Sequence, residues 1–300
     1  MVGGIEKVEF RKSNLESVFD MLIYTVLTFA ALVTLYPFIY IISMSISSPE
    51  HVLQQDIWFL PKGFSVGAYK LVFENPDVWR AYYNTIWYTL VGTTINVLMT
   101  VIGAYPLSRK NLIGRNFFTF FITFTMFFSG GLIPSFLLIK NLGLYNTRWA
   151  MVLPGAASAW YIIIARTYFQ SSIPDGLIDA AKIDGCNDIS ILFRIVLPLS
   201  APIIAVLTLF YAVGHWNSFF NALLYLPDKN LQPIQIYLVR VLIQASPELI
   251  GQIQNEFARS AYFIQLKYAV IIITILPIIC VYPFLQKYFV KGVMIGAIKE

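Results

Sequence analysis

The chain has 300 residues, of which 58% are hydrophobic and only 12% are charged, about half the charge of an ordinary soluble domain. This composition excludes a large soluble domain and indicates an integral membrane protein, because a helix needs about 20 apolar residues to cross a bilayer. The net charge of +5 comes from basic residues scattered over many short loops, so we expect no nucleic acid as a partner.

Runs without Asp, Glu, Lys or Arg predict the membrane spans in chain order. Five are clear, at residues 21–46, 85–107, 116–139, 199–223 and 268–286. A sixth, at 149–169, contains Pro154 and Gly155 and carries Arg166 near its end, where a long side chain can reach the interface. When this sixth span is counted, the loops rich in basic residues fall on one face of the membrane. The predicted fold is an all-α membrane protein with six transmembrane helices.

The basic residues also predict the orientation of these spans. With six spans, 12 of the 21 Lys and Arg residues lie on the side of the termini, and the other 9 lie mostly in two long loops. Positive charge in short loops marks the cytoplasmic side, so both termini are expected there. The predicted divisions are a cytoplasmic N-terminal segment (1–20), a membrane domain (21–286) and a cytoplasmic tail (287–300).

Two long loops are expected on the outer side. The first contains a predicted short helix near residues 67–75, and the second, from about 226 to 266, carries a helical pattern in IYLVRVLIQ. Each loop either lines an outer vestibule or forms an interfacial helix at the rim. Within the third span, residues 129–131 (Ser-Gly-Gly) and Pro134 predict a kink, which either lines a pore or only permits close packing.

Several kinds of chemistry are missing from the sequence. No phosphate-binding G-x-x-x-x-G-K-[ST] loop occurs, and the five clear spans contain no acidic or basic residue. His215 is the one titratable candidate there, interpreted as a packing residue in preference to a proton relay. Cys186 and Cys280 are too far apart in sequence to suggest a disulfide, and no set of metal ligands is evident. If the function of this protein is transport, the energy must therefore come from outside the chain.

The connector between predicted spans four and five reads SSIPDGLIDAAKIDGCNDISILFRIVLP, residues 171–198. Ser172, Pro174 and Asp175 predict a helix start, and Gly185 predicts its left-handed end. Asp188 is expected to cap a second helix that ends near residues 197–198. The predicted product is a helix-turn-helix on the cytoplasmic face.

The composition of this connector favours a protein as its partner. Ala180 and Ala181 leave room for close approach of another backbone, while the four aspartates would be repelled by an anionic cytoplasmic leaflet. The alternative is an amphipathic helix that lies in the membrane interface.

The connector resembles the EAA loop of ABC importer permeases, whose pattern is Glu-Ala-Ala, three residues, Gly, nine residues and Ile-x-Leu-Pro. The chain matches this spacing with Asp179, Ala180, Ala181, Gly185, Ile195, Leu197 and Pro198. It departs from the family in having Asp179 where Glu is usual, which shortens the reach of that carboxylate by one methylene. The resemblance implies that the helix from Ile173 to Asp184 is a coupling helix, within loop 172–198, that docks on an ATPase.

Other stretches, among them YNTRWAMVLPG and HWNSFFNALLYL, resemble the second permease subunit of maltose-type carbohydrate importers. FFSGGLIPSFLLIKNLGLYNTRW is closer to a subgroup for complex oligosaccharides, including uronate oligomers. The resemblance implies a bacterial cytoplasmic (inner) membrane protein that is a transport subunit and not an enzyme. Its implied partners are a second permease in a heterodimeric pore, two ATP-binding cassette subunits that bind ATP and Mg, and an extracellular or periplasmic sugar-binding protein.

For the sugar path, four residues of the predicted fifth span combine aromatic faces with amides: Tyr211, Trp216, Asn217 and Asn221. The same side chains also suit helix packing, and the partner permease could hold the sugar instead. An alternative function is a membrane scaffold or channel that uses the same connector to bind another cytosolic protein. A membrane-embedded enzyme is disfavoured, because the spans present no cluster of acids, bases or metal ligands.

Overall fold

The computed structural model describes residues 14–244 and 256–297, and these residues form helices without a β-strand. In chain order the elements are α1 (Asn14–Ile46), α2 (Pro49–Gln54), α3 (Gly67–Glu74), α4 (Pro76–Ser108), α5 (Arg115–Phe127), α6 (Leu132–Asn141), η1 (Arg148–Met151), α7 (Ala159–Ser172), α8 (Asp175–Ile183), α9 (Asp188–Ile191), η2 (Leu192–Val196), α10 (Leu197–Leu199), α11 (Ala201–Trp216), α12 (Phe220–Tyr225), η3 (Lys229–Leu231), α13 (Ile234–Gln244) and α15 (Glu256–Ala297). The helices predicted near 67–75 and in IYLVRVLIQ are confirmed as α3 and α13.

Within the described part of the chain, three helical stretches are long and apolar enough to cross a membrane: Leu15–Ile46, Pro76–Ser108 and Ser260–Val281. Two further pairs qualify only as bent units, α5 with α6 at 111° and Asp188–Leu199 with α11 at 83°. By length and composition, the described residues therefore contain up to five spans. Helix α15 continues to Ala297, beyond the predicted end of the membrane domain, and the first 13 residues of the predicted N-terminal segment lie outside the described part.

Two predicted spans differ from the expectation of a continuous helix. Over 149–169 the chain forms the 3-10 turn η1 and then leaves helical geometry until α7 begins at Ala159, so the predicted span is not one continuous helix. Pro154 disfavours helix at the residue before it, and Gly155 adds backbone freedom. The kink predicted in the third span is confirmed, and it is a sharp break in which Gly131 has a φ of +85°.

The chain divides into two compact units, Met1–Tyr69 with Ile250–Ile272 and Lys70–Leu249 with Ile273–Glu300. In the first unit, the buried side chain of Gln265 holds the segment that follows α1. Its Nε2 donates to the carbonyls of Ser45 (3.1 Å), Ser47 (2.8 Å) and Ser65 (3.4 Å). A buried amide needs such partners because it has left water, so this contact fixes the path of the loop.

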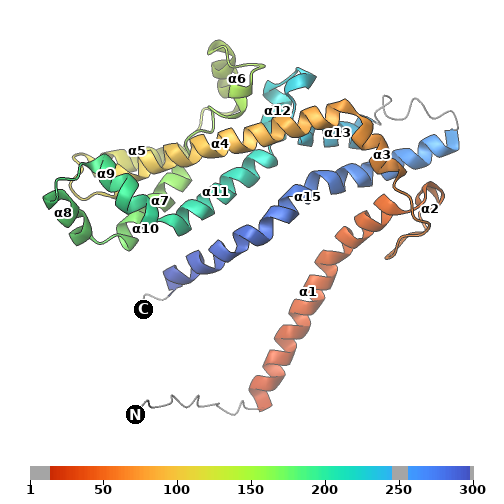
Figure 1. Ribbon diagram of the computed structural model, residues 1–300, viewed down its shortest axis with the longest axis horizontal. Helices are drawn as coiled ribbons and strands as arrows, with labels where there is room; N and C mark the ends of the chain where they lie inside the picture. Colours follow the sequence, from red (N-terminus) through yellow and green to blue (C-terminus); the bar gives the residue numbers. More distant parts are fainter. Residues whose placement is uncertain (1–13, 245–255, 298–300) are drawn as a thin grey trace. The chain divides into compact units, whose positions relative to one another are not determined.

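In the second unit, α7 and α11 pack along the long helix α4 (Figure 1). Buried apolar residues of α4, α7, α8 and α11 form one core, which includes Ala104, Phe169, Ile178 and Leu207. The connector α8–α10 lies at one end of α4, whereas η3 and α13 pack at its other end. Helix α4 therefore separates the predicted cytoplasmic connector from the predicted outer loop.

Candidate coupling site and outer polar cluster

The connector between α7 and α11 begins differently from the sequence prediction. Ser172 is the last residue of α7, so the prediction that it starts the next helix is wrong. Ile173 and Pro174 are extended, because a residue before proline is pushed out of the helical region. Helix α8 begins at Asp175 without a side-chain cap, and it is shorter than the predicted helix from 173 to 184.

The end of α8 confirms the predicted role of Gly185. Its φ is +81°, a left-handed conformation that costs other L-residues energy. The N–H of Cys186 donates to the carbonyl of Ala181 (2.9 Å), and the N–H of Gly185 donates to that of Lys182 (3.0 Å). This pair of bonds is a Schellman motif, so the last carbonyls of α8 are satisfied and the chain turns sharply.

The two alanines of the connector point to opposite environments. Ala181 is buried beside Ile178 in the core of the second unit, so it offers no free surface to a partner. Asp179 and Ala180 are exposed, as is Asp184, which caps the end of α8. The expectation that both alanines face a partner is therefore wrong for Ala181. Helical periodicity explains this, because adjacent residues lie about 100° apart around the helix.

The start of α8 is tied to the loop after α4. Nζ of Lys110 lies 2.7 Å from Oδ2 of Asp175 and donates a hydrogen bond to it. This hydrogen bond, together with the charge of Lys110, lowers the pKa of the Asp175 carboxyl below its ordinary value. Arg166 of α7 adds a bond from Nε to the carbonyl of Leu107 at the end of α4 (3.2 Å). Polar contacts thus link the connector to the loop after α4 and α7 to the end of α4, in addition to the apolar packing of α8.

The second helical segment of the connector runs from Asp188 to Leu199. Asn187, and not the predicted Asp188, caps it, with Oδ1 accepting from the N–H of Ser190 (2.8 Å). The turn at η2 is π-helical, and the N–H of Leu197 reaches the carbonyl of Leu192. A wider turn just before Pro198 is consistent with the clash of a proline ring with the preceding turn.

The remaining motif residues lie in this segment. Ile195 and Leu197 are half-buried and pack against the core of the second unit, and Pro198 is exposed. The segment ends at Leu199, slightly beyond the prediction, where an 83° bend leads into α11.

The four predicted sugar-path residues have different surroundings. Tyr211 is buried, and its hydroxyl bonds with Oγ1 of Thr100 (2.7 Å). Trp216 lines an apolar groove of about 290 Å³ between α4, α11 and α15, and its Nε1 donates to the carbonyl of Thr274 (3.2 Å). Asn217 is exposed and accepts a bond from Gln235, while Asn221 is exposed on α12. Packing occupies the two aromatic residues, and the amides lie at the surface.

His215 sits in a close contact between α11 and α4. Its Nε2 lies 2.6 Å from Oδ1 of Asn96, whose Nδ2 donates to the carbonyl of Gly155. A Cβ on Gly92 would lie only 2.4 Å from the same imidazole nitrogen, so the absence of a side chain makes this approach possible. The interpretation of His215 as a hydrogen-bonded packing residue agrees with this geometry.

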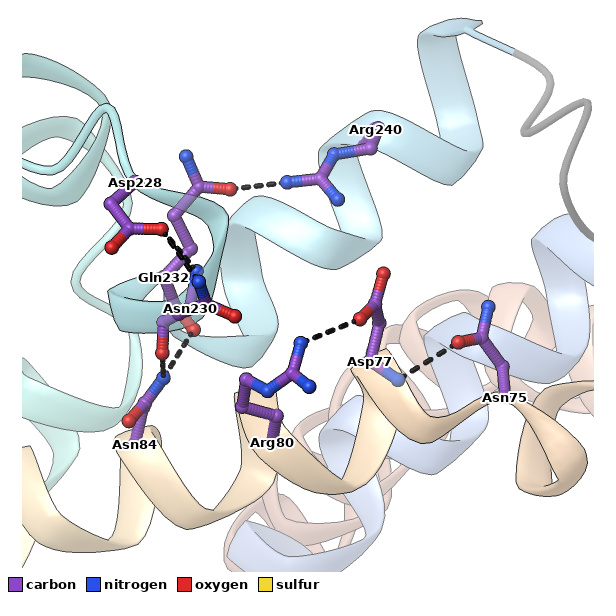
Figure 2. A network of polar contacts seen from close by, with 8 residues as sticks. All are labelled: Asn75, Asp77, Arg80, Asn84, Asp228, Asn230, Gln232 and Arg240. Atoms are coloured by element: carbon purple, nitrogen blue, oxygen red, sulfur yellow. Dashed lines mark hydrogen bonds and ion pairs between the residues drawn. The ribbon is translucent and has the colours of Figure 1, made fainter.

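At the opposite end of α4, a polar cluster that the sequence did not reveal joins α4 to η3 and α13. Figure 2 shows Asn84 facing Asn230 and Gln232, and Arg240 reaching Gln232. Asn84 Nδ2 donates to the carbonyls of Asn230 (2.7 Å) and Gln232 (3.2 Å). The one available sequence signal was a polar Asn84 at the edge of an apolar run.

The apolar helices and the anchored connector define an α-helical membrane protein in which one side of α8 is exposed at one end of the second unit. Residues 9–295 match the family described as "Binding-protein-dependent transport system inner membrane component". The chain belongs to this family, and it is an inner-membrane permease component of such a transport system.

Individual relatives cover almost the whole chain. The polygalacturonan/rhamnogalacturonan transport system permease protein YtcP of Bacillus subtilis (strain 168) is 42% identical over 94% of this chain and 98% of its own length. The arabinooligosaccharides transport system permease protein AraQ of Halalkalibacterium halodurans (strain ATCC BAA-125 / DSM 18197 / FERM 7344 / JCM 9153 / C-125) is 26% identical over 90% and 93%.

Among solved structures, a chain in the crystal structure of a bacterial ABC transporter involved in the import of the acidic polysaccharide alginate matches with a TM-score of 0.85. It is 37% identical, and the match covers 93% of this chain and 99% of that one. These matches support the permease assignment and give no support to the scaffold or channel alternative.

Proposed function

We propose that this protein is one of two permease subunits of an ATP-driven importer of acidic oligosaccharides. The observation that carries the substrate class is the identity of 42% to a polygalacturonan/rhamnogalacturonan permease and of 37% to a chain of a transporter for the acidic polysaccharide alginate, against 26% to an arabinooligosaccharide permease. Galacturonate and alginate units each carry a carboxylate, so the shared chemistry is a negatively charged sugar chain.

Helix α8 is the proposed contact with the ATPase subunits, which would bind ATP and Mg, so that this chain needs no cofactor of its own. The exposed side of α8 combines Asp179 and Ala180 with Ile183, whose exposed fraction of 86% is unusual for isoleucine. The buried side is fixed to the core through Ile178 and Ala181. A helix held in this way can transmit a displacement of the ATPase to α4 and α11.

The proposed topology has six spans with both termini in the cytoplasm. The broken pair α5–α6 supplies the third span, and the segment from η1 to the end of α7 supplies the fourth. This arrangement places α8 on the cytoplasmic side and the cluster at Asn84 on the outer side. The distribution of Lys and Arg supports it.

Coexpression with the second permease and the ATPase subunits tests the coupling role. Ala180→Trp fills the exposed small position on α8, and we expect it to abolish copurification of the ATPase and uptake of a galacturonate oligomer. Ala180→Ser is the matched control, since it keeps a small side chain on the same surface. The coupling role is wrong if the tryptophan variant, folded as the wild type, retains both the ATPase and coupled uptake.

A further inference from the structure

Arg148, the first residue of η1, lies in a fixed position against α4. Its guanidinium carbon is 5.2 Å from the ring centre of Tyr83 and 5.4 Å from that of Trp87. Its Nη2 donates to Oδ1 of Asn84 (3.1 Å). Asn84 is fully buried, and its amide nitrogen is already bonded to two loop carbonyls, so its oxygen is held facing Arg148. The cation is therefore preorganised.

Arg148 has no carboxylate partner among the described residues. Arg80, in contrast, is paired with Asp77 at 2.9 Å one helical turn away. A guanidinium has five N–H donors in a planar fork and stays charged at physiological pH, and the structure shows one donor of Arg148 in use. A half-buried cation of this kind is complementary to a carboxylate, which accepts two parallel N–H bonds from arginine.

Aromatic side chains flank this cation on an accessible surface. Tyr83 is 57% exposed and Trp149 is 44% exposed, and the Trp149 ring packs edge-on against Trp87 with ring centres 5.8 Å apart. Such faces suit the apolar side of a sugar ring, while the guanidinium suits its carboxylate. An interfacial anchor would also contain Trp, Tyr and Arg, but its arginine would extend toward water. Here Arg148 is instead bonded to a fully buried amide.

We propose that Arg148, Asn84, Tyr83, Trp87 and Trp149 form a subsite, the Arg148 cradle, for one uronate unit of an acidic oligosaccharide. The inference rests on the proposed function and adds the residues that recognise the charge. The guanidinium binds the carboxylate and the exposed rings contact the sugar face. The cradle lies at the end of α4 opposite α8. A helical rise of 1.5 Å per residue places Asn84 about 35 Å along α4 from Leu107.

Ligand titration of the assembled importer complex tests the cradle. The probes are a galacturonate trimer and the uncharged galactose trimer of the same linkage. Binding of each is measured by tryptophan fluorescence, and the Trp149→Phe variant shows which part of the fluorescence change comes from Trp149. We expect wild type to bind the acidic trimer about tenfold more tightly, the size of one charged hydrogen-bonded contact. Arg148→Gln should remove this preference, and Arg148→Lys should reduce it. Arg80→Gln, a paired surface arginine, should leave it unchanged.

The cradle is overturned if neither trimer gives a saturable signal with the wild type, or if Arg148→Gln keeps the wild-type preference for the acidic trimer. Arg148→Gln could also combine this unchanged preference with weaker ATPase activity in the presence of the binding protein. The last result would identify a protein docking surface instead. If Arg148→Gln does not fold, Arg148→Lys alone decides, because it keeps the cation over the rings and loses only the paired donors. Failure of the proposed function is distinct: wild type would import no acidic sugar although the cradle still binds the trimer.

Discussion

Substitution of Gly185 tests whether the end of α8 depends on a left-handed residue. A Cβ at this position would meet no atom within 4 Å, so Gly185→Ala introduces no steric overlap with the rest of the chain. The cost comes from the backbone alone, because φ is +81° and the left-handed region costs an L-residue about 1–2 kcal/mol. A penalty of this size favours local opening by a factor of roughly 5–30.

Amide hydrogen exchange of the importer complex measures this opening directly. The N–H groups of Gly185 and Cys186 donate to carbonyls within α8, so their exchange should accelerate by that factor in Gly185→Ala. Gly185→Asn should show a smaller effect, since asparagine tolerates the left-handed region better. Gly176→Ala is the matched control: this glycine is helical, also without neighbours within 4 Å, and alanine there should slow exchange.

A local backbone cost at Gly185 is refuted if the Cys186 amide exchanges at the wild-type rate in Gly185→Ala. It is also refuted if Gly176→Ala accelerates exchange as strongly, because the effect would then follow loss of any glycine in α8. A uniform loss of protection along the whole of α8 would point to general unfolding of the connector and would likewise contradict a local backbone cost.

Two further predictions concern the contacts of α4. Lys110→Met should raise the pKa of Asp175 toward its ordinary value. In the wild type the stabilisation from the lowered pKa is present above the ordinary value and is lost as pH falls through the lowered pKa, whereas in Lys110→Met most of it is absent at every pH. Carboxyl NMR titration checks this, and an unchanged pKa contradicts it. Gly92→Ala should lower the thermal midpoint through an overlap with His215 that costs about 1–3 kcal/mol. Gly103→Ala, with its nearest neighbour at 3.3 Å, should cost less, and equal midpoints would contradict the packing argument.

The sequence predicted features that depend on composition or on a single turn of chain. The apolar runs indicated a helical membrane protein, since the bilayer requires about 20 such residues per helix. The glycine at position 185 predicted the left-handed turn observed there, because glycine adopts that conformation without a side-chain clash. The break near Gly131 was expected for the same kind of local reason. The start of α8 was predicted wrongly, because Ser172 remained within α7.

Tertiary structure alone decided which side chains meet. Ala180 and Ala181 are adjacent and chemically identical, yet only the core of the second unit determines that one is exposed and the other buried. His215 and Asn96 are 119 residues apart, and their contact requires α11 to pack on α4. The same holds for Arg148, which in sequence is a loop charge and in the fold is held over two rings of α4. Local preferences extend over about one helical turn, whereas burial and polar partners depend on segments brought together by packing.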